Sequence, residues 1–293
     1  MSRLELLSTL VNSKVLQIRL YNWLIESLLL YIGITRLKFI LNKYMISNKK
    51  TILILGSTGS LGSSIAKKFL NEKNFIKKYE IILTSTNKKK FNKTFFNYSN
   101  SNIKYFNFNL LKYSKKNIFI KFLKKKKIDI FINATGAINR SDFRNETLKK
   151  WNEILDINLN IPMEIIKIIL KKMIKNRYGK IVNFSSQVAR NSHPFASPSY
   201  EVSKSAILAL NRHLTKKYSK FNINFNTLVP GTISSKMQKT MSKKQLSKIK
   251  QSIPQKRLGD PNEIAELVFF LTSDKAAYIN GASINISGGS IID

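Results

Sequence analysis

Four polar residues in the second half of the chain have the types and spacing needed to pass a proton to a carbonyl oxygen. Ser185 and Ser186 end an apolar run at 180–184 that predicts a buried strand. Tyr200 and Lys204 lie four positions apart where a helical pattern begins, so the phenol and the ammonium project from one helix face. A hydroxyl that faces a Tyr–Lys pair is the minimum set of groups for this chemistry. Because the Tyr–Lys spacing alone more often marks an aromatic and a surface lysine, the surrounding elements must decide.

A glycine-rich turn near residue 56 has the context of a dinucleotide site. It follows an apolar run at 51–55 that predicts a strand, and a helical pattern follows at 63–70. Glycines let the backbone turn tightly and approach a pyrophosphate, and a helix start offers free N–H groups and a partial positive charge. The turn consists of Gly56, Ser57, Thr58, Gly59, Ser60, Leu61 and Gly62.

The end of the next apolar run, at 80–84, bears on which dinucleotide binds. In sheets of this kind the second strand ends at the adenosine ribose, where an Asp or Glu selects NAD. Here the run is followed by Ser85, Thr86, Asn87 and Lys88, without an acid. Hydroxyls and a lysine suit an additional 2′-phosphate, so we expect NADP in preference to NAD. The competing interpretation is that Lys88 is one lysine among many.

The alternation of strand and helix patterns predicts the fold class. Further strand patterns lie at 102–109, 128–132, 180–184, 223–229 and 282–286. Helical patterns lie at 114–127, 147–175 and 260–271. We expect an α/β fold with a doubly wound, seven-stranded parallel sheet and helices on both faces, in a single domain at 50–293. Pro162 should kink or divide its helix. Ligands in such folds lie beyond the carboxyl ends of the strands. This rule gathers at one rim Gly56, Asn133, Ser185 and Ser186.

Composition and charge narrow the classes of partner. The chain has 51 basic and 16 acidic residues, a formal charge of +35, and its lysines are spread over the whole length. No zinc-finger spacing, RNP-like aromatic motif or Arg-rich arm occurs, so we expect no specific nucleic-acid partner. An acidic protein or a phosphorylated substrate would still be attracted. The absence of cysteine, and the lack of a carboxylate at ligand spacing from His193 or His213, predict no metal site.

Residues 1–49 differ from the rest of the chain and predict an extension of unknown role. The most apolar part, 24–41, contains Glu26, Arg36 and Lys38, which makes it a poor membrane span. It also lacks the cleavage site of a signal peptide, so we expect a cytoplasmic protein. Three interpretations stay open: an amphipathic helix on a membrane or another subunit, a targeting segment, and a start misassigned upstream of Met45.

From about residue 50 to 293, the chain resembles the short-chain dehydrogenase/reductases, in their single-domain branch with a Rossmann fold. The motifs that carry the resemblance are Gly56 to Gly62, Asn133-Ala-Thr-Gly136, Asn158, Ser186, Tyr200-x3-Lys204 and Pro230-Gly231. The segment 257–265 and the pair Gly288-Gly289 resemble the 3-oxoacyl-carrier-protein reductases and their many relatives.

The resemblance implies a site at named positions. The catalytic tetrad would be Asn158, Ser186, Tyr200 and Lys204, with Ser185 as a strand-end residue. Asn109 stands where the family has an acid that contacts the adenine, and Gly59 gives a glycine spacing more usual in the family's extended branch. Besides the glycine turn, the cofactor-binding residues would be Ser85, Asn109, Asn133, Ala134, Gly136, Tyr200, Lys204, Pro230, Gly231, Ile233 and Ser235.

The implied reaction is hydride transfer from NADPH to a ketone, or the reverse. Ser186 would bind the carbonyl oxygen and Tyr200 would donate the proton. Lys204, with the charge of the oxidised nicotinamide, would lower the pKa of Tyr200 from about 10 toward about 7. Such acid–base help is worth typically about 10²–10⁴-fold in rate. Asn158 would hold a water that resupplies protons through Lys204.

Three functions remain open at this point. The first is a 3-oxoacyl-carrier-protein reductase, whose acidic partner the basic surface would suit. The second is an oxidoreductase acting on a sugar, a nucleotide sugar or another small alcohol. The third is a non-catalytic nucleotide- or RNA-binding protein on the same fold. We also expect residues 232–256 to form a substrate lid, and a homo-tetramer or dimer built with the helices that carry Asn158 and Tyr200.

Overall fold

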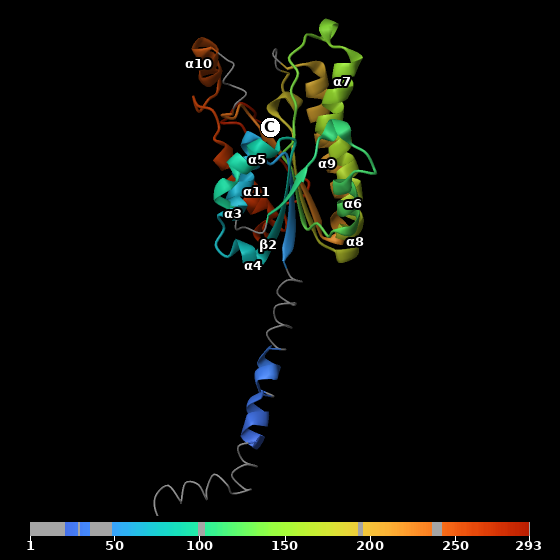
Figure 1. The fold of residues 1–293 in the computed structure, drawn as a ribbon. Coiled ribbons are helices and arrows are strands. Elements are labelled where there is room, and N and C mark those ends of the chain that lie inside the picture. The colour runs from blue at the N-terminus through green and yellow to red at the C-terminus, as the bar shows by residue number, and fades with distance from the viewer. Residues whose placement is uncertain are drawn as a thin grey trace, which may run out of the picture. The chain divides into compact units, whose positions relative to one another are not determined.

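Seven parallel strands form one sheet in the part of the chain that the computed structural model describes, residues 21–28, 30–35, 49–98, 103–192, 196–235 and 242–292 (Figure 1). Their order is β3-β2-β1-β4-β5-β6-β7, so the chain reverses direction across the sheet between β1 and β4. This arrangement confirms the predicted fold class. The strands are β1 Lys50–Leu55, β2 Tyr79–Ser85, β3 Ile103–Asn107, β4 Ile130–Asn133, β5 Gly179–Phe184, β6 Ile223–Pro230 and β7 Ser283–Ile286.

Helices cover both faces of the sheet (Figure 1). One face carries α3 Ser60–Leu70, α4 Phe75–Lys78, α5 Lys88–Thr94 and α11 Pro261–Thr272. The other carries α6 Ile118–Lys125, α7 Leu148–Leu155, α8 Ile161–Asn176 and α9 Pro198–Tyr218. Helix α10, Lys243–Ser252, follows β6. Single 3-10 turns are η1 Phe96–Tyr98, η2 Leu110–Lys112, η3 Phe143–Asn145, η5 Gln187–Ala189, η6 Ser219–Phe221 and η8 Asp274–Ala276.

The hydrophobic core consists of two clusters, one on each face of the sheet. Strand β1 shows how the sequence divides between them. Ile52 and Ile54 pack in the cluster that includes α3 and α11, whereas Leu53 and Leu55 pack in the cluster that includes α6 and α8. Successive strand residues point to opposite faces, so a strand covered on both sides needs a continuous apolar run. The run at 51–55 therefore predicted a strand for a physical reason.

Pro162 divides the long helical stretch after Thr147, as predicted. Helix α7 ends at Leu155, residues Asp156–Asn160 form one π-helical turn (η4), and α8 begins at Ile161. Proline has no N–H and its ring clashes with the carbonyl four residues earlier, which belongs to Asn158. The interruption therefore falls at the residue that the resemblance places in the active site.

The segment predicted as a lid contains regular structure in its described residues. Ile233 forms an isolated β-bridge with Gly259. Helix α10 begins with a capping box, in which the side chains of Ser242 and Gln245 each accept a hydrogen bond from the other's backbone N–H. Ile253, just after α10, is buried. Residues 236–241 of the segment, and His193, lie outside the described residues. The lid function stays a prediction.

Contacts divide the chain into two units, Met1–Lys49 and Lys50–Asp293. In the first unit, residues 21–28 and 30–35 are helical, and their large apolar side chains are exposed, Trp23 by 65%. Among the described residues, no helix has the length and apolar character to span a bilayer. The open interpretations of the extension stay predictions.

Candidate active site

A cavity of about 830 Å³ lies beyond the carboxyl ends of the strands, where the chain reverses between β1 and β4. One wall comes from the glycine turn and the other from the end of β5 and the start of α9. The cavity therefore joins the predicted cofactor turn to the predicted proton-transfer residues. The predicted residues that line it are Thr58, Gly59, Ser60, Leu61, Ala134, Gly136, Ser186, Tyr200, Lys204, Pro230, Gly231, Ile233 and Ser235.

Two glycines of the turn are required by the backbone itself. Gly56 has φ +73°, and a Cβ there would lie 2.9 Å from the carbonyl oxygen of Ala134. A Cβ on Gly62 would overlap the carbonyl oxygen of Gly56. Gly59 is different, because it is the N-cap of α3 in an extended conformation and offers no side chain to cap it. The free N–H groups at the start of α3 are therefore available to an anion.

Several residues predicted to bind the cofactor lie behind the cavity wall. Ser57 is buried, and its hydroxyl donates a hydrogen bond to the Thr84 carbonyl oxygen at 3.0 Å. The Ser85 hydroxyl is bonded to the Thr58 hydroxyl at 2.9 Å and accepts from Asn87 N. The side chains of Ser57 and Ser85 therefore shape the turn and do not line the cavity.

Two asparagines predicted as cofactor contacts are engaged in local structure. Asn109 caps η2, because its Oδ1 accepts from Leu111 N at 3.0 Å. The Oδ1 of buried Asn133 accepts from the Thr135 hydroxyl at 2.5 Å. Neither lines the cavity, in contrast to Ala134 and Gly136 beside them.

Three lysines that sequence reasoning missed line the glycine-turn end of the cavity: Lys67 of α3, and Lys90 and Lys93 of α5. The predicted Lys88 does not line it. Asn87 caps α5 and accepts from Lys90 N at 2.8 Å, so this helix starts directly after β2. The signal was the three-residue spacing of Lys90 and Lys93, which share a helix face. It was hidden by the abundance of lysine in this chain.

The structure brings Ser186, Tyr200 and Lys204 together at the other end. Ser186 follows β5 and lines the cavity beside Tyr200. The Lys204 ammonium lies 5.7 Å from the centre of the Tyr200 ring and donates to the Phe184 carbonyl oxygen at 2.9 Å. Ser185 is buried, and its hydroxyl donates to the Lys204 carbonyl oxygen at 2.7 Å. It thereby ties the end of β5 to α9.

The protein groups by themselves do not lower the pKa of Tyr200, and the predicted lowering, which included the charge of the oxidised nicotinamide, stays a prediction. Burial raises the pKa of the Tyr200 phenol, and the hydrogen bond with Ser186 lowers it only in part. Lys204 is itself fully buried, which lowers the pKa of its ammonium to about 8. The prediction counted the attraction between the two groups and omitted the cost of removing both from water.

Asn158 lies in the π-helical turn and is buried, and its role of holding a water stays a prediction. Its Oδ1 accepts from Ala137 N at 2.8 Å. Its Nδ2 donates to the Ala137 carbonyl oxygen at 3.0 Å and to the Ser203 hydroxyl at 2.9 Å. Both amide hydrogens are therefore used to connect the loop after β4 with α9.

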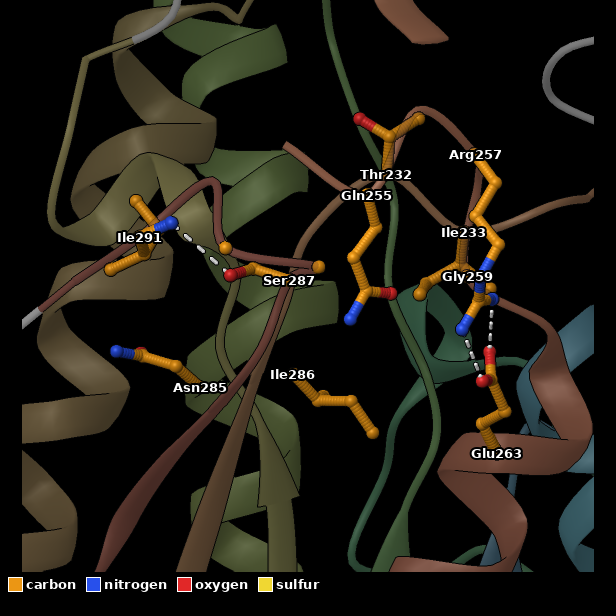
Figure 2. Close-up of a pocket in the computed structure, with 12 residues that line it drawn as sticks. Thr232, Ile233, Gln255, Arg257, Gly259, Glu263, Asn285, Ile286, Ser287 and Ile291 are labelled. Atoms are coloured by element: carbon orange, nitrogen blue, oxygen red, sulfur yellow. Dashed lines mark hydrogen bonds and ion pairs between the residues drawn. The ribbon is translucent and has the colours of Figure 1, made fainter. Parts of the chain in front are cut away.

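A second cavity, of about 330 Å³, lies against Thr232 and Ile233, which line both cavities (Figure 2). Figure 2 shows Arg257 and Glu263 facing each other in a fork, with N–O distances of 2.8 and 2.6 Å. The hydrogen bonds from Arg257 and from Asp260 N lower the pKa of Glu263 to about 2. Gly259 N donates to Thr232 O, and Ser234 N donates to Gly259 O. This segment thereby supports the wall that carries Ile233.

Comparisons with known proteins decide the family. The family model described as "Enoyl-(Acyl carrier protein) reductase" matches residues 57–290. The chain is 32% identical to the 3-oxoacyl-[acyl-carrier-protein] reductase of Buchnera aphidicola subsp. Baizongia pistaciae, over 84% of this chain and 98% of that protein. The chain belongs to the short-chain dehydrogenase/reductase family. It is accordingly an oxidoreductase that acts on CH–OH groups with a nicotinamide cofactor.

Solved structures agree with this short-chain dehydrogenase/reductase fold. A 3-oxoacyl-[acyl-carrier protein] reductase from Brucella melitensis superposes with a TM-score of 0.74 at 21% identity, over 84% of this chain and 93% of that one. A putative gluconate dehydrogenase from Agrobacterium tumefaciens superposes with a TM-score of 0.74 at 25% identity, over 82% and 95%. The individual roles of the tetrad and the cofactor residues stay predictions, as does the oligomeric state.

Proposed function

We propose that this short-chain dehydrogenase/reductase reduces the 3-oxo group of an acyl chain carried by acyl carrier protein, with NADPH as the hydride donor. One observation carries the proposal: a single cavity is lined both by the glycine turn and by Ser186, Tyr200 and Lys204. The substrate class is supported by the relative from Buchnera, which this chain matches over nearly its whole length. A net charge of +35 also suits an acidic carrier protein.

The preference for NADPH follows from the charges at the glycine-turn end. Strand β2 ends in Thr84 and Ser85, so there is no carboxylate to bind a ribose 2′-hydroxyl or repel a 2′-phosphate. Lys90 and Lys93 line the cavity from α5, and Lys67 lines it from α3. Ammonium groups on two elements that meet at this point favour the additional phosphate of NADPH.

In the proposed reaction NADPH, when bound, supplies the hydride, and residues of the chain supply the proton. Ser186 and Tyr200 line the same cavity, so both hydroxyls can be directed at one carbonyl oxygen. Burial raises the pKa of Tyr200, which keeps the phenol protonated at neutral pH until the oxygen gains negative charge. Pro162 cannot donate to the Asn158 carbonyl oxygen, and we assign the proton-supplying water to that oxygen rather than to the side chain.

The test is a purified enzyme assay that follows the loss of NADPH absorbance. Acetoacetyl thioesters of carrier protein should be reduced with NADPH faster than with NADH. Tyr200→Phe should lower turnover about 10²–10⁴-fold while NADPH still binds. Wild-type turnover in Tyr200→Phe would remove the assigned proton donor, and faster turnover with NADH would remove the role of the three lysines.

A second candidate is a dehydrogenase of sugar acids. It is favoured by the structural likeness to the putative gluconate dehydrogenase from Agrobacterium tumefaciens, at 25% identity. The positive field would attract a sugar carboxylate as well as a carrier protein. Assaying keto derivatives of sugar acids beside the thioesters separates the two candidates, because one enzyme preparation should show the higher kcat/KM for its preferred class of substrate.

A further inference from the structure

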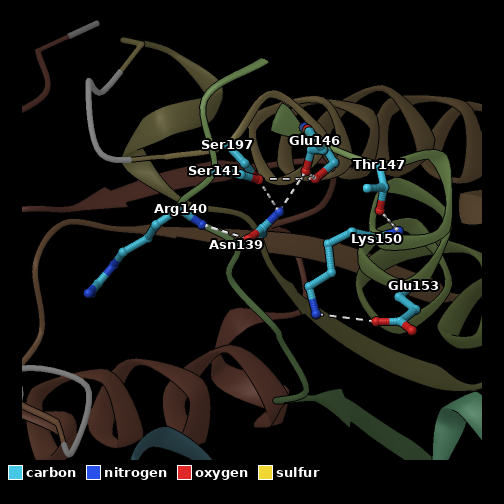
Figure 3. Close-up of polar contacts among 9 residues, drawn as sticks. Asn139, Arg140, Ser141, Glu146, Thr147, Lys150, Glu153 and Ser197 are labelled. Carbon is cyan, nitrogen blue, oxygen red and sulfur yellow. Dashed lines mark hydrogen bonds and ion pairs between the residues drawn. The ribbon is translucent and has the colours of Figure 1, made fainter. Parts of the chain in front are cut away.

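A carboxylate outside the tetrad holds the segment from which Tyr200 projects. Glu146 follows η3, where the loop after β4 enters α7 (Figure 3). Its Oε2 accepts from Ser199 N at 3.1 Å. Its Oε1 accepts from the Ser199 hydroxyl and from Asn139 Nδ2, the latter at 2.9 Å. Because Ser199 directly precedes Tyr200, this carboxylate bonds to the first turn of α9.

The N–H groups at this helix start can be accounted for one by one. Pro198 has none. Tyr200 N donates to the Ser197 hydroxyl at 3.4 Å, and Glu201 N donates to the Ser197 carbonyl oxygen at 3.1 Å. Within the described residues, two N–H groups at this helix start are satisfied from elsewhere in the chain: that of the cap residue Ser197 by the Asn139 carbonyl oxygen, and that of Ser199 by Glu146. Helix starts leave such groups without internal partners, so removal of Glu146 would leave the buried N–H of Ser199 unpaired.

A second set of hydrogen bonds joins the loop after β4 to the start of α9. Ser197 N donates to the Asn139 carbonyl oxygen at 3.0 Å, and the Ser197 and Ser199 hydroxyls are 3.1 Å apart. Both serines are fully buried. Figure 3 shows Asn139, Ser197 and Glu146 gathered at one point, with Lys150 and Glu153 paired separately on α7.

The negative charge of Glu146 strengthens its hydrogen bonds to the start of α9. Burial would raise the pKa of Glu146, but the hydrogen bonds from Ser199 and Asn139 outweigh it and lower the pKa below its usual value. The group is therefore an anion at neutral pH, placed at the positive end of a helix of 21 residues. Hydrogen bonds that involve an ionised acceptor are roughly twice as strong as neutral ones.

The anchored loop also forms part of the cavity wall. Ala137 and Ile138 line the cavity, and Asn139 follows them directly. On its other side Ala137 is bonded by Asn158 through both backbone groups. The loop is thus fixed at one end by the tetrad asparagine and at the other by Glu146.

We propose that Glu146 is a positioning residue for the reduction, which fixes the start of α9 against the loop after β4 and so sets where the Tyr200 phenol meets the substrate carbonyl. The inference rests on the proposed function, because it concerns the proton donor of that reaction. Glu146 itself touches neither the cavity nor the reacting atoms. Its loss should therefore affect the step in which the proton is donated, and leave cofactor binding unchanged.

The experiment compares Glu146→Ala and Glu146→Gln with Glu153→Ala in the full chain. Glu153 is a matched control, because among the described residues its carboxylate is paired with exposed Lys150, at 3.2 Å. Glu146→Ala should lower kcat about 10- to 100-fold, since small misplacements of reacting groups have effects of this size. Glu146→Gln keeps one acceptor oxygen and should fall between. The KM for NADPH should stay within about twofold, and the Glu153→Ala enzyme should match the wild type.

Amide hydrogen exchange over 199–204 gives a readout that does not depend on turnover. Exchange there should be faster in Glu146→Ala and unchanged in Glu153→Ala. Wild-type kcat in Glu146→Ala would overturn the inference, and so would an equal loss of NADPH binding and of global stability, which would make the role merely structural. If the wild-type enzyme reduces none of the carbonyl substrates, the proposed function fails. Unchanged exchange at 199–204 would then overturn the anchor independently.

Discussion

Replacing Lys204 with methionine should stabilise the protein at pH 7 while it removes activity. The side chain is fully buried, and burial lowers the pKa of its ammonium from 10.5 to about 8. The protonated form is therefore less favourable in the folded chain than in the unfolded chain, by about 3 kcal/mol. Methionine also loses the hydrogen bond to the Phe184 carbonyl oxygen, which costs about 1 kcal/mol. We expect the free energy of unfolding to rise by about 2 kcal/mol.

The pH dependence identifies the cause. Above pH 10.5 the lysine is uncharged in both states and the penalty is absent, whereas below about pH 8 it is fully present. Wild-type stability should therefore rise, relative to Lys204→Met, as the pH goes from 8 to 10.5. Urea unfolding midpoints at pH 7 and pH 10.5 measure this, with Lys216→Met on the exposed face of α9 as the control. A variant that is no more stable than the wild type at pH 7, or a difference that does not change with pH, would refute the reasoning.

Three further predictions follow from contacts in the same domain. Asn211 is buried, and neither its Nδ2 nor its Oδ1 has a hydrogen-bond partner among the described residues. Asn211→Leu should therefore raise the free energy of unfolding, measured by urea titration, by about 1–3 kcal/mol. A loss of stability would show that a partner is present. The double variant Lys90→Ala, Lys93→Ala should raise the KM for NADPH about tenfold and leave the KM for NADH unchanged. Lys89→Ala, at an exposed position of the same helix, is the control. Equal effects on both cofactors would contradict the assignment of these lysines to the 2′-phosphate. Gly62→Ala places a Cβ 2.9 Å from the carbonyl carbon of Gly56. Fluorescence titration should therefore show that the affinity for NADPH falls more than about tenfold. Unchanged affinity would mean that the backbone of the turn shifts to accommodate the methyl group without a loss of binding.

The fold could be predicted because its strands are buried on both faces. The continuous apolar run at 51–55 is the direct consequence of two-sided burial, and it corresponds to β1. The edge strand was less well predicted. The alternation at 102–109 suggested eight residues, but β3 ends at Asn107. Asn109 instead caps η2, a local hydrogen bond that competes with the strand and leaves no trace in hydrophobic periodicity.

The site residues could be predicted where strand and helix ends place them. They were less well predicted where a side chain can hydrogen-bond either to the backbone or to a ligand. Ser186, Tyr200 and Lys204 meet because a strand end and a helix start lie at one rim. The sequence could not show that Ser57 and Ser85 turn away from the cavity, because hydroxyls bond equally well to the backbone. Glu146 was also missed. Nothing in a single acid, 53 positions before Ser199, indicates that the two are bonded.

Burial at this site has opposite effects on stability and on chemistry. The ammonium of Lys204 would be more stable in water, and the folded chain loses about 3 kcal/mol by holding it beside the Tyr200 ring. The same dry surroundings raise the pKa of the phenol, so that it retains its proton near neutral pH. A proton donor for a reduction must do this until the carbonyl oxygen becomes basic, and only then is a nearby ammonium most useful, because it stabilises the phenolate that remains. In the proposed reaction, the burial that disfavours the Lys204 ammonium would therefore accompany a Tyr200 phenol that keeps its proton until late in the reaction.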